Sequence, residues 1–367
     1  MKKVVIITNA PAPYRVAFFH YLQTTESNYQ FHVIYTSQNE NIGRAWQVSS
    51  EDLGSHSFLE CKVITLKRRY DNKHIVISTG IQKQLSNLQP DIVICMEYNL
   101  TILQAVHWCQ THHVPFLSWS DGTSNSEKNI NRLQLAFRHY VIRRAKGFIS
   151  SSTATLEHQT ALGANHKNCY KSLLTVDIDK YLQEKPASYI PGTSLLYVGS
   201  LIGRKGLDLL FPALALTDPK IELYIVGDGG EKDALLEQAN LLGISNRIHF
   251  LGYLEGDALN ACYQNFDAFI LPTREDCFGL VMLEAMCASL PVIASKYADG
   301  AFDLITSEKY GSIVDPYDPQ ELANAITSLF SDPSVLAEKQ HACYMHAKEF
   351  SFKNVSHAFY EALDSIQ

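Results

Sequence analysis

Two acidic residues in the stretch 270–295 are placed where they could do chemistry. Asp276 lies in a short polar loop, and Glu284 follows eight residues later. The run from Leu280 to Ala288 is apolar at nearly every position, which predicts a buried helix with Glu284 in its middle. Because a buried carboxylate without partners costs free energy or changes its protonation state, something must hydrogen-bond to Glu284.

The start of this helix offers a site for phosphate. The backbone amides of Gly279, Leu280 and Val281 would point out of a helix N-terminus, which carries a partial positive charge. A carboxylate, a phosphate site and a second carboxylate then lie in one line. A nucleotide sugar needs that order of partners, for its sugar hydroxyls, its diphosphate and its ribose hydroxyls. The alternative is that Glu284 pairs with a core Arg or Lys and that Asp276 merely caps the helix.

The same stretch resembles a known family. The residues DCFGLVMLE (276–284), followed by AM and by PVIA at 291–294, are similar to the acid-x7-Glu signature of the retaining glycosyltransferases of family 4, which have the GT-B fold. Asp276 stands where the family usually has Glu, and Phe278 is part of the matched signature. The resemblance implies that Glu284 binds the ribose hydroxyls, that Asp276 orients the donor sugar, and that anomeric configuration is retained.

A second segment, LYVGSLIGRKGL (196–207), resembles the part of the family that binds the donor diphosphate. Arg204 and Lys205 would neutralise the diphosphate, because charge-assisted hydrogen bonds are stronger than neutral ones. Ser200 stands where the family usually has Arg. The alternative is a solvated Arg-Lys pair at the start of a helix.

Two further positions border the nucleotide in the resemblance. Gly227 opens the turn GDGG between a strand and a helix, although tight turns of this kind need glycine in any case. Tyr253 ends the segment 246–253, which resembles the segment that receives the base. Ordinary packing at a strand end would equally explain Tyr253.

The N-terminal half contributes two candidates. Arg15 follows the turn after the first strand, where it would contact phosphate or the acceptor. Asp121 follows a later strand end, in a loop where family members often place a His or an acid near the transferred sugar. A plain Asp-Gly turn is the alternative for Asp121.

The elements that must position these residues follow an α/β pattern. Strands alternate with helices in two successive stretches, which predicts two Rossmann-like, doubly wound parallel sheets facing across a cleft. The Pro, Ser and Gly content of 183–193 marks a linker. We expect an acceptor-binding domain at 1–185 and a donor-binding domain at 186–350, and the resemblance implies that the helix at 351–367 returns to pack on the first. Ile75–Leu88 is expected to be a helix.

Composition narrows the class of protein. The chain has 367 residues and a net charge of −7, which does not favour nucleic acid as a partner. Eight cysteines without C-x-x-C spacing indicate a reducing, cytoplasmic location and no structural zinc. No apolar run reaches the length of a membrane span. No H-E-x-x-H pair is present, so we expect no metal and no cofactor. The basic segment Arg132–Lys146 would lie on the inner face of the membrane or form a solvated helix face.

These observations together predict a metal-independent, hexosyltransferase-type glycosyltransferase. It would move a sugar from a UDP or GDP sugar to a hydroxyl of a glycan or lipid-linked acceptor, in the synthesis of cell-surface polysaccharide, lipopolysaccharide or capsule. Two alternatives remain open. One is a sugar-nucleotide epimerase or hydrolase on the same fold, and the other is a non-catalytic GT-B partner subunit.

Overall fold

The computed structural model of the protein describes residues 1–38, 48–67, 72–186 and 188–366. Contacts between Cα atoms divide the chain into two compact units, unit 1 (Met1–Asp177 with Phe352–Gln367) and unit 2 (Ile178–Ser351). The unit borders therefore differ from the expected borders at 185/186 and 350/351, the first by eight residues and the second by one. The stretch 183–193 belongs to unit 2, where the Lys185 ammonium donates to the Phe266 carbonyl oxygen at 2.8 Å.

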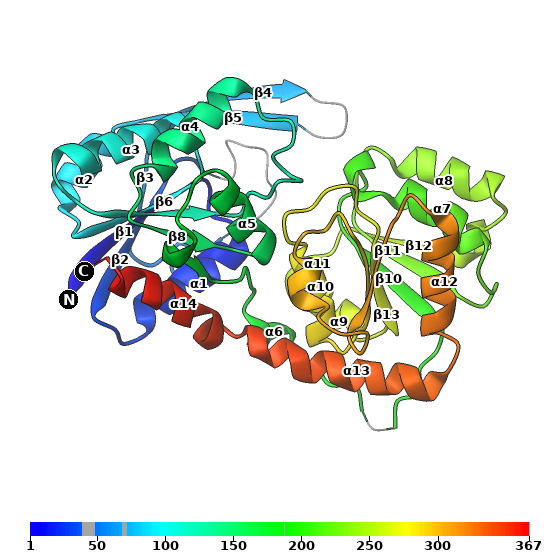
Figure 1. The fold of residues 1–367 in the computed structure, drawn as a ribbon. Helices are drawn as coiled ribbons and strands as arrows, with labels where there is room; N and C mark the ends of the chain where they lie inside the picture. Colours follow the sequence, from blue (N-terminus) through cyan, green and yellow to red (C-terminus); the bar gives the residue numbers. More distant parts are fainter. Residues whose placement is uncertain (39–47, 68–71, 187, 367) are drawn as a thin grey trace. The chain divides into compact units, whose positions relative to one another are not determined.

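Unit 1 is built on a seven-stranded parallel sheet in the order β3-β2-β1-β6-β7-β8-β9 (Figure 1). The central strands β1 and β6 are apolar runs, and most of their side chains are buried, as expected for a sheet covered on both faces. The strands of unit 1 are β1 Lys2–Thr8, β2 Tyr29–Tyr35, β3 His56–Phe58, β4 Glu60–Lys67, β5 Asn72–Thr79, β6 Ile92–Met96, β7 Phe116–Ser120, β8 Gly147–Ser150 and β9 Cys169–Lys171.

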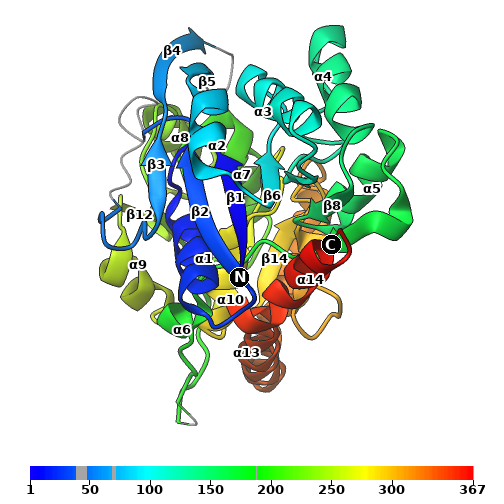
Figure 2. The same cartoon turned by 90° about the vertical axis from the view of Figure 1, so that its left-hand side faces the viewer.

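Helices cover both faces of this sheet, as Figure 2 shows. One core forms where α1 and α14 pack on the sheet, and it contains Phe19, Trp119 and Phe359. The other core forms under α2, α3 and α4 and contains Ile102 and Phe116. The helices of unit 1 are α1 Pro13–Thr24, α2 Ile81–Leu88, α3 Leu100–Thr111, α4 Arg132–Ile142, α5 Thr153–Ala161, η2 His166–Asn168 and α14 Phe352–Asp364.

The expected helix Ile75–Leu88 is wrong in its first part. Residues 72–79 form β5, which pairs antiparallel with β4 and places Ile75 opposite Ile64. Gly80 then adopts a left-handed φ of 85°, and α2 begins at the next residue. The β-branched residues before Gly80 favour a strand, and their pairing partners lie in β4, upstream of the predicted helix.

Unit 2 contains a six-stranded parallel sheet in the order β12-β11-β10-β13-β14-β15. Its strands are β10 Ser194–Val198, β11 Glu222–Val226, β12 Ile248–Gly252, β13 Ala268–Leu271, β14 Val292–Ser295 and β15 Gly311–Val314. In this unit α7 contacts α8 and α12, whereas α10 contacts α6, α11 and α13. Its helices are α6 Ile178–Tyr181, η3 Gly203–Lys205, α7 Leu207–Ala215, α8 Lys232–Leu241, η4 Ser245–Arg247, α9 Gly256–Tyr263, α10 Leu280–Cys287, α11 Ala301–Leu304, α12 Pro319–Leu329, α13 Pro333–Ala347 and η5 Lys348–Phe350.

The strand orders fix where a ligand is expected in each unit. In unit 1 the chain runs outward from β1 to β3 in one direction and from β6 to β9 in the other, and unit 2 repeats this with β10 and β13. The order therefore reverses between β1 and β6 and between β10 and β13. In open parallel sheets the crevice beyond the carboxyl ends of such a strand pair is the usual ligand site.

Candidate functional site

The loops at the switch point of unit 2 bring the expected donor-binding residues together. The Lys205 ammonium, which precedes α7, donates to the Asp276 carboxylate at 2.6 Å, and their side chains are 15% and 17% exposed. The two loops are also joined through the backbone, where the Arg274 amide donates to the Arg204 carbonyl oxygen at 2.8 Å. The sequence placed Lys205 and Asp276 in separate motifs, and the fold makes them one ion pair.

The ion pair sets the charge of Asp276. Burial alone would raise the pKa of the Asp276 carboxyl, but the charge and hydrogen bond of Lys205, aided by Arg204, hold it below its usual range. The Phe278 amide also donates to this carboxylate, at 3.3 Å. Asp276 therefore stays ionised, and it also supports the loop that leads into α10.

Two arginines fix the same loops. The Arg204 guanidinium donates to the carbonyl oxygen of Glu275 at 2.9 Å. Arg274 forms a bidentate ion pair with Asp208 of α7, with distances of 2.7 and 2.6 Å. Arg274 was not singled out from the sequence, because Asp208 lies 66 positions upstream and no local pattern joins them.

Gly279 turns the chain from this loop into α10. It adopts a left-handed φ of 77°, and a Cβ atom there would lie 2.9 Å from the side chains of Leu271 and Met282. Gly279 is the N-cap of α10 and, lacking a side chain, caps no amide. The amides of Leu280 and Val281 belong to the first turn, which has no acceptor within the helix. The adjacent Phe278 is buried and anchors the turn.

Glu284 lies in the middle of α10, as expected, and its partner is a tyrosine. The Tyr263 hydroxyl, at the end of α9, donates to the Glu284 carboxylate at 2.8 Å. Burial raises the pKa of the Glu284 carboxyl to about 7, although the tyrosine hydrogen bond favours the ionised form. Within the described ranges no Lys or Arg forms an ion pair with Glu284, so the alternative of a core salt bridge is not supported.

Three other donor-side candidates lie on neighbouring loops of unit 2. Ser200 is exposed just after β10, and its carbonyl oxygen accepts from the Tyr197 hydroxyl at 3.1 Å. Gly227 is buried with a φ of 138°, against the Gly199 carbonyl oxygen, where no larger residue fits. Tyr253 is 53% exposed, and its hydroxyl donates to Glu255 at 2.8 Å.

The two candidates of unit 1 are bonded to each other. The Arg15 guanidinium lies 4.4 Å above the Trp119 ring and forms an ion pair with Asp121. The Ser151 hydroxyl donates to the same Asp121 oxygen at 2.5 Å. Asp121, expected to be catalytic, and Arg15, expected on the acceptor side, therefore lie in one cluster at the carboxyl edge of this sheet.

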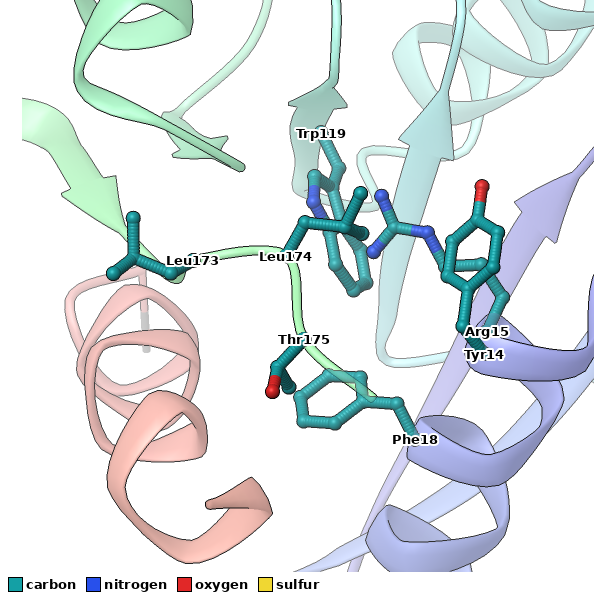
Figure 3. A pocket seen from close by; sticks show the side chains of 7 residues that line it. All are labelled: Tyr14, Arg15, Phe18, Trp119, Leu173, Leu174 and Thr175. Atoms are coloured by element: carbon teal, nitrogen blue, oxygen red, sulfur yellow. The ribbon is translucent and has the colours of Figure 1, made fainter. Parts of the chain in front are cut away.

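A small pocket lies beside this cluster, and Figure 3 shows the Arg15 guanidinium between the rings of Trp119 and Tyr14. The pocket has a volume of about 10 Å³, room for roughly one water molecule and not for a sugar ring. Its lining residues are Tyr14, Arg15, Phe18, Trp119, Leu173, Leu174 and Thr175.

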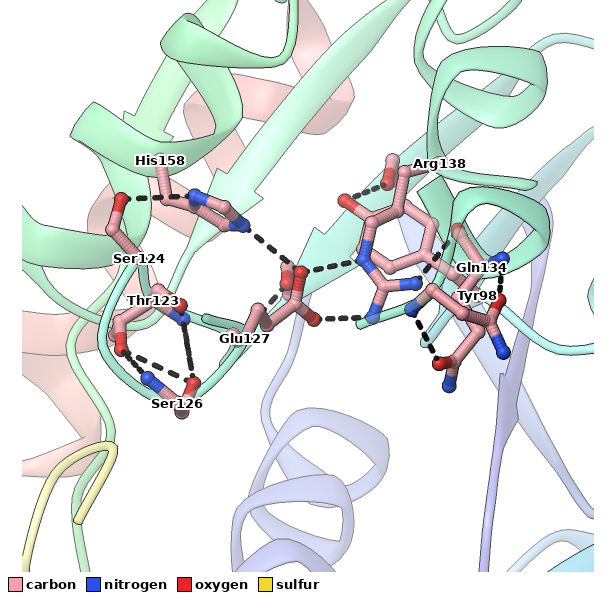
Figure 4. A network of polar contacts seen from close by, with 12 residues as sticks. Tyr98, Thr123, Ser124, Ser126, Glu127, Gln134, Arg138 and His158 are labelled. Atoms are coloured by element: carbon pink, nitrogen blue, oxygen red, sulfur yellow. Dashed lines mark hydrogen bonds and ion pairs between the residues drawn. The ribbon is translucent and has the colours of Figure 1, made fainter. Parts of the chain in front are cut away.

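A buried polar network holds the loop that carries Asp121 (Figure 4). Glu127 accepts two hydrogen bonds from Arg138 of α4, both 2.5 Å long, and one from His158 of α5 at 2.9 Å. Burial opposes the ionised form of Glu127, but the His158 and Arg138 hydrogen bonds outweigh it and lower its pKa. The Arg138 guanidinium also lies 5.0 Å from the ring of Tyr98. None of these partners was predicted from the sequence.

The network changes the interpretation of the basic segment Arg132–Lys146. Arg138 is only 8% exposed and faces inward, whereas Arg132, Arg143 and Lys146 are exposed. Contact of this segment with a membrane stays a prediction. In the part of the chain that the structure describes, no helix combines the length and the apolar character needed to cross a membrane.

Residues 1–38, 48–67, 72–186 and 188–366 contain no group of three or more His, Cys, Asp or Glu side chains arranged to hold a metal ion. The expectation that the protein acts without a metal or cofactor stays a prediction.

The chain is similar in sequence to known glycosyltransferases. Residues 182–350 match the family model of the glycosyl transferases group 1. An uncharacterized glycosyltransferase of Methanocaldococcus jannaschii is 34% identical over 144 residues, which are 38% of this chain and 36% of that protein. The lipopolysaccharide 1,6-galactosyltransferase of Salmonella typhimurium is 25% identical over 308 residues, which are 81% of this chain and 79% of that protein. These relatives are named glycosyltransferases, the class of enzyme that the sequence predicts, and the chain spans only about a third of the length of the first of them.

Solved structures confirm the fold. The structure of Anabaena HepE in complex with UDP superposes with a TM-score of 0.79 over the full length of both chains, at 18% sequence identity. Such low identity shows the fold alone. The two Rossmann-like units with parallel sheets are those of the GT-B class, as the sequence predicted.

Proposed function

We propose that this chain, whose residues 182–350 match the glycosyl transferases group 1, transfers a sugar from a nucleoside diphosphate sugar to an acceptor hydroxyl. The donor is a UDP or GDP sugar, the anomeric configuration is retained, and no metal takes part. One observation carries the proposal. The switch point of unit 2 places Lys205, Asp276 and the start of α10 together, and Glu284 lies within that helix.

Lys205 and α10 supply the contacts that a diphosphate needs. An ammonium has three N–H donors, and the hydrogen bond to Asp276 uses one, so two remain for phosphate oxygens. The first-turn amides of Leu280 and Val281 add neutral donors, and the helix dipole adds positive potential. These groups stabilise the negative charge that develops on the departing diphosphate, which is the main catalytic contribution in this proposal.

The two carboxylates bind the two ends of the donor. Asp276 is held ionised, so it accepts hydrogen bonds from hydroxyls of the transferred sugar. Glu284 has a single described partner, Tyr263, and its second oxygen accepts from a ribose hydroxyl. In this proposal the exposed Tyr253 lies beside the base, and Ser200 and Gly227 border the nucleotide.

Unit 1 binds the acceptor in this proposal. The Arg15–Asp121 pair provides donors and acceptors for an acceptor glycan or lipid-linked sugar. The galactosyltransferase relative is named for lipopolysaccharide, which supports a role in cell-surface polysaccharide, lipopolysaccharide or capsule synthesis. Such acceptors are made at the inner face of the membrane, so we place the protein in the cytoplasm, in peripheral contact with that face.

Thermal unfolding with added nucleotides tests the donor site. A ligand that binds only the folded state stabilises it, by about 2.7 kcal/mol at a concentration of 100 Kd. In a panel of UDP, GDP, UDP-glucose, UDP-galactose and GDP-mannose, we expect one diphosphate and its sugars to raise the midpoint. Lys205→Met should abolish the shift, because it removes the cation from the site.

A matched control is available on the opposite edge of the same sheet. Lys309 is exposed just before β15, so Lys309→Met should keep the full nucleotide shift. The proposal fails if no nucleotide moves the midpoint, or if both lysine variants respond like the unchanged protein. Release of UDP or epimerised donor without any acceptor would instead favour the hydrolase or epimerase alternative.

A further inference from the structure

Glu97 has a backbone conformation that its position in the fold does not explain. In the described ranges four residues other than glycine have positive φ angles, Gln89, Glu97, His113 and Ser289. Three of them end helices, where a left-handed residue is common: Gln89 caps α2, and the other two follow the C-caps of α3 and α10. Glu97, with a φ of 74°, instead follows the last residue of β6.

A left-handed residue with a Cβ atom is strained, and such strain collects at functional sites. Glu97 stands at the carboxyl end of β6, one of the two strands that form the switch point of unit 1. Its backbone amide lies 3.4 Å from the Trp119 carbonyl oxygen of β7, so the strained turn is tied to the neighbouring strand. The conformation fixes the direction of the glutamate at the place where this sheet is expected to bind a ligand.

The charges around Glu97 come from α1, from α4 and from the loop between β7 and α4. Asp121 and Glu127 repel its carboxylate, and Arg15 and Arg138 attract it. The two arginines already have carboxylate partners, Arg15 with Asp121 and Arg138 with Glu127. Among the residues that the structure describes, none donates a hydrogen bond to the Glu97 carboxylate, and the residue is exposed to solvent.

We propose that Glu97 is a sugar-binding residue of unit 1, whose carboxylate accepts hydrogen bonds from hydroxyls of the acceptor carbohydrate beside the Arg15–Asp121 pair. This rests on the proposed function, because it names the substrate class of the acceptor site. An ionised carboxylate only accepts hydrogen bonds, and a sugar offers several O–H donors. When Glu97 is ionised, Glu97, Asp121 and Arg15 together carry one net negative charge, which favours a neutral polyol over a phosphate group.

The raised pKa of Glu97 agrees with this role. The side chain is exposed in part, but the protein packed around it, and then the charges of Asp121 and Glu127, disfavour the ionised carboxyl group and raise its pKa to about 7. A bound hydroxyl would stabilise the ionised form, so sugar binding should lower this pKa.

Sugar binding by the full-length chain, saturated with UDP, tests the proposal. The probes are the methyl glycosides of glucose, galactose, mannose and N-acetylglucosamine. Their binding is measured by saturation-transfer NMR. We expect at least one glycoside to bind, and we expect Glu97→Gln and Glu97→Gly to weaken its binding about tenfold or more, since a charge-assisted hydrogen bond is lost. Glu157→Gln, an exposed glutamate of α5, is the matched control and should bind normally.

Stability separates a binding role from a structural one. Glycine adopts a positive φ without strain, so Glu97→Gly should raise the unfolding midpoint of unit 1 by about 2–4 °C while it weakens sugar binding. The UDP shift should be unchanged in all variants. If UDP did not raise the unfolding midpoint of the unchanged protein, the proposed function itself would be overturned. Three results would overturn only the role of Glu97, provided that UDP still shifts the midpoint. No glycoside binds, the Glu97 variants bind as well as the unchanged protein, or Glu97→Gly is less stable than the unchanged protein.

Discussion

The Glu284 carboxyl group titrates near neutral pH because it is buried and Tyr263 is its one described partner. Its pKa is about 7 in the folded protein, above the value of 4.5 for a glutamate in an unfolded chain. Between these values the folded state binds more protons than the unfolded state. The contribution of Glu284 to stability is therefore present below pH 4.5 and is lost as the pH rises to about 7.

This predicts a pH-dependent stability that one substitution removes. Within that window, each unit by which the pH rises lowers the free energy of unfolding by at most about 1.4 kcal/mol through this one group. Glu284→Gln cannot ionise, so its urea-unfolding free energy should fall less between pH 5 and pH 7 than that of the unchanged protein. The exposed Glu237 of α8 provides the control, since Glu237→Gln should keep the original slope. Identical slopes for all three proteins would show that Glu284 is ionised throughout.

The spacing of Asp276 and Glu284 could be read from the sequence, but their partners could not. The buried helix α10 predicted that Glu284 needs a hydrogen-bond donor, yet the donor lies 21 residues upstream, in another helix. Lys205 and Asp276 are 71 residues apart, and Arg15 and Asp121 are 106 apart. Local patterns identify residue types, whereas strand order in the sheet decides which of them meet.

At the scale of elements, Gly206 connects η3 to α7 and sets the position of Lys205. Its φ is 74°, and a Cβ atom there would collide with the Pro272 carbonyl oxygen of the opposite loop. Gly243, after α8, has a similar φ of 68° but open space around it. A substitution at either glycine introduces backbone strain, but only one at Gly206 also disturbs the contact with the opposite loop.

We predict that Gly206→Ala destabilises unit 2 more than Gly243→Ala does. The backbone strain alone costs about 1–2 kcal/mol, and only Gly206→Ala must also push the loop after β13 away. The UDP-induced shift should shrink in Gly206→Ala and stay intact in Gly243→Ala, as thermal unfolding with and without UDP would show. Equal effects of the two substitutions on the shift would contradict a role of this contact in placing Lys205.

The elements themselves were predictable where the pattern was local. Alternating apolar strands and helices gave both parallel sheets, because a strand buried on two faces must be apolar throughout. The hairpin of β4 and β5 was missed, because Ile75–Thr79 carries no turn signal before Gly80 and its pairing partner lies across residues 68–71. The polar network around Glu127 was also missed, since its members come from two helices and a loop.

At the scale of the whole molecule, each unit has its own sheet and core, so we expect two unfolding transitions. Phe359 of α14 is fully buried in unit 1, and its ring centroid lies 5.3 Å from that of Trp119. Phe359→Ala leaves a cavity that costs about 3–5 kcal/mol. For a unit of this size the midpoint should fall by on the order of 10 °C.

Calorimetry with and without UDP tests this expectation. Phe359→Ala should lower the transition that UDP does not shift and leave the UDP-sensitive transition in place. Tryptophan fluorescence should follow the lowered transition, because all three tryptophans of the chain belong to unit 1. Lys353→Ala, an exposed position on the same helix, should change neither transition. A single transition that UDP shifts as a whole would contradict independent unfolding.

Unit 2 interrupts unit 1 in the chain, because residues 352–367 return to the unit in which the chain begins. The closing helix is bonded there, with the Tyr29 hydroxyl donating to Asp364 at 2.5 Å. A chimaera made with one crossover near residue 177 would therefore pair the rest of unit 1 with a foreign α14, which lacks the native packing of Phe359. Exchange of 178–351 as a cassette, with two crossovers, keeps the core of unit 1 intact, so the proposed donor-binding unit could be replaced without disturbing the unit around it.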